Sequence, residues 1–279
     1  MSNFRDRTIT GLSMVFLLLA ALFFNPWFFA ALFLLVVVLG LWEFYSIVGN
    51  DTNQPQKIYG TIAGAIIYID IICLHLLPEL PLWTVRSLTV FPLILFFFPF
   101  IIEIYRKRSH PLNNISITVS GLLYIALPLA LMNLLNGPGA ATFLGFPALL
   151  LAYFILTWFY DTGAYLYGKQ FGKHKFFERI SPRKTWEGIV AGGIVAIATA
   201  VAFSFLVKDV MLIDWIVLTL LVLFFGTYGD LVESLFKRSL HIKDSGTILP
   251  GHGGILDRFD SLFLSAPFVF LYFYLRNLI

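Results

Sequence analysis

Charged residues and cysteine are both scarce in this chain of 279 residues. Only 13% of the residues are Asp, Glu, Lys or Arg, whereas 59% are hydrophobic. In ordinary soluble domains, roughly a quarter of the residues are charged. This composition argues against a soluble fold and predicts a multi-pass membrane protein. The single cysteine, Cys73, excludes disulfides and cysteine-ligated zinc as organising features.

Several common catalytic motifs are absent as well. The sequence has no GxxxxGK[ST], HExxH or GxSxG pattern, which argues against a P-loop nucleotide site, a zinc metalloprotease and a serine hydrolase. The formal charge of only +3 gives no indication of nucleic acid binding. Membrane lipids with anionic head groups are the simpler partner.

Apolar stretches are what the chain has in abundance, and each is about as long as the ~17 to 25 residues that a spanning helix needs. They lie near residues 8–24, 27–49, 58–77, 87–105, 115–135, 143–168, 188–207, 211–236 and 259–275. We therefore expect an all-α polytopic protein with about nine transmembrane helices. Only Asn25 and Pro26 separate the first two stretches, so a tight hairpin or a re-entrant unit would fit the same pattern.

The basic residues test this nine-helix arrangement and orient it. One side receives Arg5, Arg7, Lys57, Arg106, Lys107, Arg108, Lys169, Lys173, Lys175, Arg179, Arg183, Lys184, Lys237, Arg238, Lys243 and Arg258. The other side receives Arg86, Lys208 and Arg276. The excess predicts a cytoplasmic N-terminus. It also predicts one membrane domain over 1–279, with a helical scaffold in 1–140 and a catalytic half in 141–279 that has two cytoplasmic loops, 169–187 and 237–258.

Five carboxylates fall inside apolar stretches, where each costs on the order of 2.5 to 3.5 kcal/mol at a helix centre and requires a partner or a role. They are Glu43, Asp70, Asp161, Asp230 and Glu233. All except Asp70 fall toward the cytoplasmic ends of their helices. The spacing of Asp230, Glu233, Ser234 and Lys237 places them on one helical face. That face either lines a wet cavity or holds a Glu233–Lys237 salt bridge with Asp230 hydrogen-bonded nearby.

Two further segments combine acid, base and glycine. DTGAYLYGKQFGK, residues 161–173, places Asp161 above a glycine-punctuated basic helix end, which suits phosphate or, alternatively, membrane-anchoring lysines. SPRKTWEG, residues 181–188, precedes an apolar helix that Thr185 or Glu187 could cap. Arg183 and Lys184 could hold a polyphosphate there or form an ordinary positive flank. His252, between glycines, is a metal ligand, a general base or a turn residue.

The segment SLFKRSLHIKDSGTILPGHGGILDRFD, residues 234–260 and called the signature segment below, resembles the signature of phosphatidate cytidylyltransferases, the integral membrane CDP-diacylglycerol synthases. The matching residues are Ser234, Lys237, Arg238, Lys243, Asp244, Gly246, Pro250, His252, Gly253, Gly254, Asp257, Arg258 and Asp260. The segments that begin at Asp161 and Ser181 are also similar to that family. Arg183 stands where the family more usually has lysine.

The resemblance implies that CTP and phosphatidic acid condense to CDP-diacylglycerol and pyrophosphate at the bacterial inner membrane. Cations must screen two anions during such a reaction. We therefore expect Asp230 and Asp257 to ligate Mg²⁺, with Asp161 contributing directly or through water. The expected catalytic residues are Asp161, Lys237, Arg238, His252, Asp257 and Arg258. The expected substrate-binding residues are Lys173, Ser181, Arg183, Lys184, Thr185, Glu187, Ser234, Lys243, Asp244, Gly253, Gly254 and Asp260.

Within that set, the basic residues would bind the triphosphate or the lipid phosphate, and the backbone of residues 252–254 would cradle an oxyanion. A homodimer is plausible from the resemblance alone. Two other functions fit parts of the pattern. A CTP-dependent polyprenol or phytol kinase would use similar phosphate-binding groups, and a transporter would use intramembrane acids as an ion path. The crowding of polar residues at one face argues against the transporter.

Overall fold

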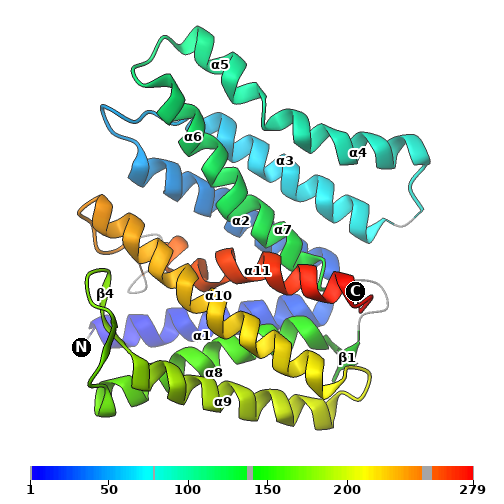
Figure 1. The fold of residues 1–279 in the computed structure, drawn as a ribbon. Helices are drawn as coiled ribbons and strands as arrows, with labels where there is room; N and C mark the ends of the chain where they lie inside the picture. The colour runs from blue at the N-terminus through cyan, green and yellow to red at the C-terminus, as the bar shows by residue number, and fades with distance from the viewer. Residues whose placement is uncertain (1, 78, 137–140, 247–252, 279) are drawn as a thin grey trace. The chain divides into compact units, whose positions relative to one another are not determined.

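The computed structural model describes residues 2–77, 79–136, 141–246 and 253–278, and these residues form an all-α membrane protein with two short β-hairpins (Figure 1). Seven helical segments are long and apolar enough to cross a membrane, counted over the described ranges. They are Pro26–Val48, Lys57–Leu76, Leu82–Arg106, Pro111–Asn133, Ala148–Phe171, Trp186–Leu206 and Leu212–Ser239. The prediction of a polytopic helical protein is confirmed, and the number nine stays a prediction.

The chain divides into two compact units that differ from the predicted halves. Unit 1 contains Met1–Pro138 together with Ile242–Phe259, and unit 2 contains Gly139–His241 together with Asp260–Ile279. The signature segment is therefore shared between the units: its middle belongs with the N-terminal helices, whereas both of its ends belong to unit 2.

Unit 1 is built from consecutive helices whose ends follow from local sequence. They are α1 (Ser2–Phe24), α2 (Pro26–Val48), α3 (Lys57–Leu76), α4 (Leu82–Leu95), α5 (Phe98–Arg106), α6 (Pro111–Gly121), a π-helical turn η1 (Leu122–Ala126) and α7 (Leu127–Asn133). Asn25 separates the first two helices, because its Oδ1 accepts a hydrogen bond of 2.8 Å from the Trp27 N–H and caps α2.

The break between α4 and α5 falls just before Pro99. Pro99 has no N–H to donate to the carbonyl of Leu95, four residues earlier, which favours a break at this point, although α4 itself continues through Pro92. The Tyr59 hydroxyl donates to the Leu95 carbonyl instead, at 2.6 Å. The expected single stretch near 87–105 thus becomes two helices.

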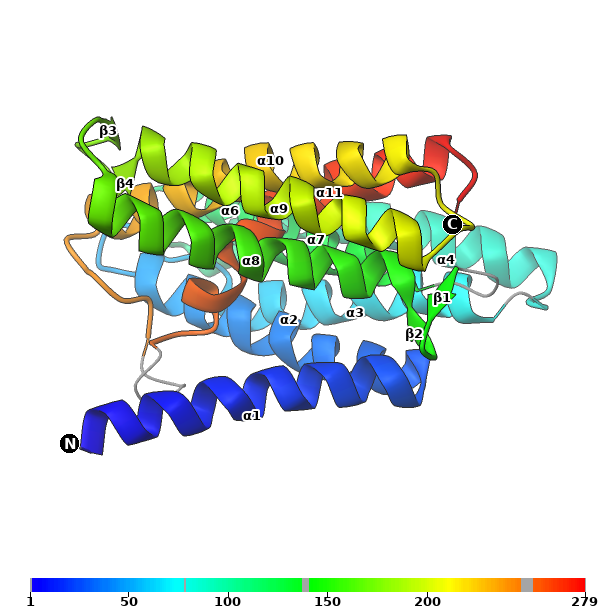
Figure 2. The same ribbon diagram turned by 90° about the horizontal axis from the view of Figure 1, so that it is seen from below.

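Unit 2 has the order β1 (Thr142–Phe143), β2 (Phe146–Pro147), α8 (Ala148–Phe171), β3 (Lys175–Phe177), β4 (Ser181–Thr185), α9 (Trp186–Leu206), α10 (Leu212–Ser239) and then α11 (Leu256–Leu275), of which residues from Asp260 onward belong here. Both strand pairs are antiparallel hairpins. They lie at opposite ends of α8 (Figure 2). The hairpin β3–β4 replaces much of the loop expected at 169–187.

Glycines allow α8 and α9 to pack closely side by side (Figures 1 and 2). A Cβ atom on Gly192 would lie 2.7 Å from the Tyr160 carbonyl oxygen, and one on Gly188 would lie 2.6 Å from the Ala164 carbonyl oxygen. Either contact is too short for a real Cβ. Gly188 and Gly192 therefore set the separation of the two helices that position Asp161 and β4.

Candidate functional site

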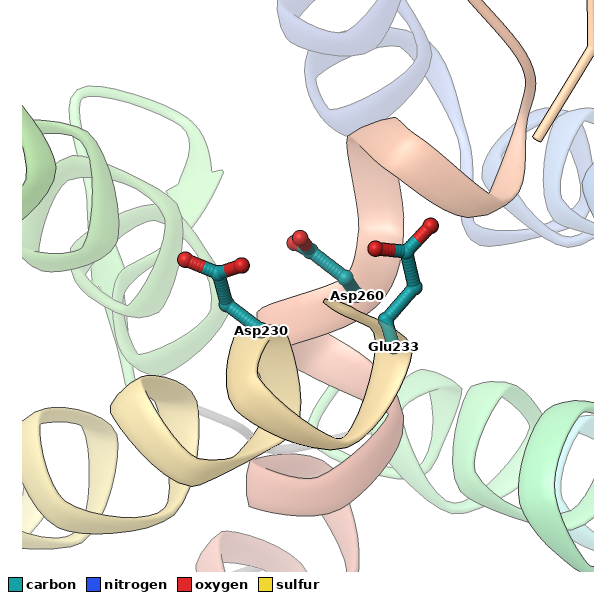
Figure 3. A group of neighbouring side chains, drawn as sticks. All are labelled: Asp230, Glu233 and Asp260. Atoms are coloured by element: carbon teal, nitrogen blue, oxygen red, sulfur yellow. The ribbon is translucent and has the colours of Figure 1, made fainter. Parts of the chain in front are cut away.

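Unit 2 contains a compact group of three carboxylates. Asp230 and Glu233 lie on α10, and Asp260 lies on α11; one oxygen from each lies within 4.8 Å of one from each of the others. Figure 3 shows Asp260 between the other two, with all three side chains directed to the same side of α10. Glu233 is only 3% exposed. We call these residues the acidic cluster.

Two lysines neutralise part of this charge. Lys184 Nζ, from β4, lies 2.6 Å from Asp230 Oδ2, and Lys237 Nζ lies 2.5 Å from Glu233 Oε2. The ion pairs found among the described residues provide no basic partner for Asp260. The three carboxylates of the cluster outnumber the two lysines, and the nearby Asp161 adds a further acidic group, so the site attracts a cation.

The salt bridge that the spacing of Glu233 and Lys237 suggested is therefore present. Asp230 has contacts in both directions: its Oδ2 pairs with Lys184 of the hairpin β3–β4, and its Oδ1 accepts a hydrogen bond of 3.2 Å from Ser234 Oγ on its own helix. Both parts of the structural alternative are thus present, and the functional interpretation depends on the pairing of Asp230 with Lys184. Asp161 is exposed and close enough to Lys184 and Asp230 to interact with both electrostatically. Segments predicted separately at 161, 184 and 230 thus come together.

The N-terminus of α9 explains why Lys184 reaches this place. Thr185 is buried and caps α9, accepting a hydrogen bond of 3.2 Å from the Gly188 N–H, as expected from the sequence. Glu187 accepts hydrogen bonds from the backbone N–H groups of Lys173 and His174, and its Oε1 lies 2.6 Å from His174 Nδ1. These contacts fasten the hairpin to the helix. Arg183, one residue before Lys184, stays exposed.

The predicted site residues divide between the two units. Unit 2 holds Asp161, Lys173, Ser181, Arg183, Lys184, Thr185, Glu187, Asp230, Ser234, Lys237, Arg238 and Asp260. Unit 1 holds Lys243, Asp244, Gly253, Gly254, Asp257 and Arg258. His252 lies outside the described residues, so its predicted catalytic role stays a prediction.

In unit 1, the HGG loop, defined here as the described residues 242–246 and 253–259, is held by carboxylates. Asp257 Oδ2 accepts hydrogen bonds from the Ser245 N–H at 2.9 Å, from Ser245 Oγ at 2.9 Å and from the Gly254 N–H at 3.0 Å. The Gly254 N–H, predicted to help cradle a substrate oxyanion, is thus engaged by the chain's own carboxylate. Ligation of a metal by Asp257 together with Asp230 stays a prediction.

Two members of the acidic cluster were not among the metal ligands predicted from the sequence. Glu233 was placed on a helical face that either lines a wet cavity or forms a salt bridge, and Asp260 was expected to bind substrate. The missing information was the start of α11: the expected apolar stretch began near residue 259, whereas the helix begins at Leu256. Helical periodicity from that point places Asp260 one turn beyond Asp257.

Comparison with known proteins gives consistent matches along the chain. Residues 5–276 match the cytidylyltransferase family. The phosphatidate cytidylyltransferase of Haemophilus influenzae is 32% identical over 295 residues, which cover 97% of this chain and 98% of that protein. The phosphatidate cytidylyltransferase of Staphylococcus aureus (strain COL) is 52% identical over 116 residues, 41% of this chain and 44% of that protein. The one from Staphylococcus haemolyticus is 50% identical over 116 residues.

Proposed function

This chain belongs to the cytidylyltransferase family, and we propose that it condenses CTP with phosphatidic acid to give CDP-diacylglycerol and pyrophosphate. The observation that carries this proposal is the acidic cluster with its lysines in unit 2. It combines oxygen ligands for a cation with basic groups for phosphates, within a helical membrane protein. The nearly full-length match to a phosphatidate cytidylyltransferase supports the choice of substrates.

The acidic cluster suits a hard divalent cation, which prefers carboxylate oxygens. We infer that the ion is Mg²⁺ and that Asp230 and Asp260 hold it, with Glu233 or Asp161 contributing directly or through water. Mg²⁺ usually keeps several waters and takes only one or two carboxylates, so three neighbouring acids are sufficient. When bound, the ion would polarise phosphoryl oxygens and neutralise charge on the leaving pyrophosphate.

The basic residues would carry the remaining anionic charge. Arg183 and Lys173 are exposed at the hairpin and suit the β- and γ-phosphates of CTP. Lys184 pairs with Asp230 and would bind the phosphate at which the reaction occurs. Lys237 and Arg238, near the end of α10, would hold the phosphate of the lipid.

The proposed reaction needs no covalent intermediate with the protein. An oxygen of phosphatidate attacks the α-phosphorus of CTP, and the bond from that phosphorus to the β-phosphate bridging oxygen breaks. The electron pair leaves with pyrophosphate. The protein aligns the two phosphates and screens their repulsion, which is the main requirement of phosphoryl and nucleotidyl transfer. We place this site at the cytoplasmic face of the bacterial inner membrane, because CTP is cytoplasmic and the basic residues crowd one side of the predicted topology.

The direct test uses detergent-purified protein, CTP labelled at the α-phosphate, and phosphatidic acid in mixed micelles. We expect the label in a lipid product and the release of one pyrophosphate for each lipid product formed. A CTP-dependent kinase would instead release labelled CDP and phosphorylate an added polyprenol. The absence of a labelled lipid across a range of Mg²⁺ concentrations would refute the proposed function.

A further inference from the structure

Glu43, in the part of the chain predicted to be scaffold, directly holds the HGG loop of unit 1. Its side chain is on α2 and the residue is 5% exposed. Oε2 accepts a hydrogen bond of 2.8 Å from the Ile255 N–H, and Oε1 accepts one of 3.3 Å from the Leu256 N–H. Ser245 Oγ also donates to Oε1. A residue of the second helix thus caps the start of α11, more than 200 positions later.

The loop is shaped around this carboxylate. A Cβ on Gly254 would lie 1.9 Å from Glu43 Oε1, and a Cβ on Gly246 would lie 3.1 Å from the Glu43 carboxyl carbon. Glycine at 254 is therefore required by the space that Glu43 occupies. Ser245 links this carboxylate to Asp257, because its hydroxyl contacts both. The two acids and the serine fix the ends of the loop to each other and to α2.

Among the residues that the structure describes, no basic side chain pairs with the buried carboxylate of Glu43. The described ion pairs include none to Glu43, so backbone N–H groups and one hydroxyl stabilise it. An ionised carboxylate is a pure acceptor, whereas glutamine at this position would turn an NH₂ group toward at least one of these donors. The arrangement therefore favours a carboxylate over its neutral isostere, which a purely space-filling role would not require.

We propose that Glu43 is a positioning residue for the transferase reaction, holding the HGG loop in the shape in which its polar groups meet the phosphates. This inference rests on the proposed function, because the expected roles of the loop, substrate binding by Lys243 and Asp244 and catalysis by Arg258, belong to that function. It assigns a role in catalysis to the N-terminal helices, which sequence reasoning treated as scaffold.

The experiment compares Glu43→Gln with Glu103→Gln as a matched control. Glu103 is also 5% exposed and also belongs to unit 1. It too accepts several hydrogen bonds, from Gln56, Asn114 and Arg106 at 2.7–2.8 Å, but it is remote in sequence from the loop and makes none of its contacts. For each protein, kcat and the KM for CTP are measured, along with thermal unfolding and backbone hydrogen exchange without substrates.

We expect Glu43→Gln to lower kcat by about 10- to 100-fold with a smaller change in the KM for CTP, because misplaced groups slow the reaction more than they weaken binding. Hydrogen exchange at Ile255 and Leu256 should accelerate about tenfold or more, since these amides lose a charged acceptor. Glu103→Gln should lower the unfolding temperature while leaving kcat and the exchange of the HGG loop unchanged. Glu43→Asp, which keeps the charge, should recover part of kcat.

Unchanged kcat in a folded Glu43→Gln protein would overturn the proposal. So would equal losses of kcat in both glutamine variants, because that result would mean general destabilisation. If Glu43→Gln does not fold, Ser245→Ala decides: it removes the hydroxyl shared by Glu43 and Asp257 and should lower kcat and accelerate loop exchange in the same way. The exchange data need no activity, so a wild-type protein that makes no CDP-diacylglycerol would refute the proposed function separately.

Discussion

Substitution of Asp260 by asparagine gives the sharpest test of the acidic cluster. The change removes one negative charge but keeps Oδ1, so the hydrogen bond of 2.7 Å from the Ser261 N–H can remain. In the wild-type protein the three carboxylates of the cluster outnumber its two lysines by one. In Asp260→Asn the two numbers are equal, so the site, which also includes the neighbouring Asp161, has one acidic group fewer. The cluster should then lose most of its attraction for a divalent cation.

The size of the effect follows from Coulomb's law. A single negative charge and a divalent cation ~4 Å apart interact by ~8 kcal/mol at the effective dielectric constant near a protein surface. Dehydration of the ion offsets much of this gain. If about a quarter survives, the loss is ~2 kcal/mol, which corresponds to a roughly 30-fold increase in the Mg²⁺ concentration at half-maximal activity.

The assay is the rate of CDP-diacylglycerol formation against free Mg²⁺ at fixed, saturating CTP and phosphatidic acid. Asp214→Asn is the matched control, because Asp214 is a fully buried acid of the same unit, paired with Arg276 at 2.9 Å. It lies 16 residues before Asp230 on α10, about 24 Å along the helix. Its substitution should lower stability and leave the Mg²⁺ midpoint unchanged. A midpoint in Asp260→Asn within twofold of wild type would refute the assignment of Asp260 to the metal.

Three further predictions concern residues around the cluster. Lys184→Gln should lower kcat/KM for CTP by about tenfold or more in steady-state assays, since a charged contact to phosphate and to Asp230 is lost. An equal loss in Lys184→Arg, which keeps the positive charge, would contradict the idea that this charge is what the residue contributes. Gly192→Ala should destabilise the protein by about 1–3 kcal/mol, measured by thermal unfolding in detergent, because its Cβ would force α8 and α9 apart. Gly193→Ala is the control and should leave stability unchanged, because its Cβ would lie at an ordinary 3.5 Å from Leu223. Arg276→Met should lower the unfolding temperature, because it leaves the buried Asp214 without its ion-pair partner, and kcat should be unaffected; a normal unfolding temperature would contradict this.

Hydrophobic content and stretch length were sufficient to predict the fold class, because a helix is the simplest way to satisfy backbone groups in a bilayer. Helix boundaries that depend on neighbouring residues were also predicted correctly: Asn25 separates the first two helices, and Thr185 caps α9. The break at Pro99 and the hairpin β3–β4 were missed. A polar segment between apolar stretches resembles a loop by composition alone, and strand pairing depends on contacts that periodicity does not contain.

The candidate site shows the same limit more clearly. Helical spacing on α10 correctly joined Glu233 to Lys237, since both residues share one helix. The partner of Asp230 could not be obtained in this way, because Lys184 reaches it from a hairpin whose position depends on how closely α8 and α9 pack. Gly188 and Gly192 set that distance. From the sequence, the glycine-containing segments at 161–173 and 181–188 were interpreted only as possible phosphate-binding sites.

Glu43 illustrates what a buried charge in a sequence can and cannot reveal. Its position in an apolar stretch showed that it needs a partner, and the physical cost of burying a charge made that inference sound. Its partners, however, are the Ile255 and Leu256 N–H groups and the hydroxyl of Ser245. Backbone N–H groups and serine hydroxyls are common along the chain, so residue type alone could not identify them. The glycines of the HGG loop were the remaining clue, because glycine permits close approach of another group as well as a turn. Among the described residues, the buried acid Glu43 has no basic partner, and the glycine-rich loop makes room for its carboxylate. A buried acid and a glycine-rich segment can thus be contact partners even when two hundred residues separate them in the sequence.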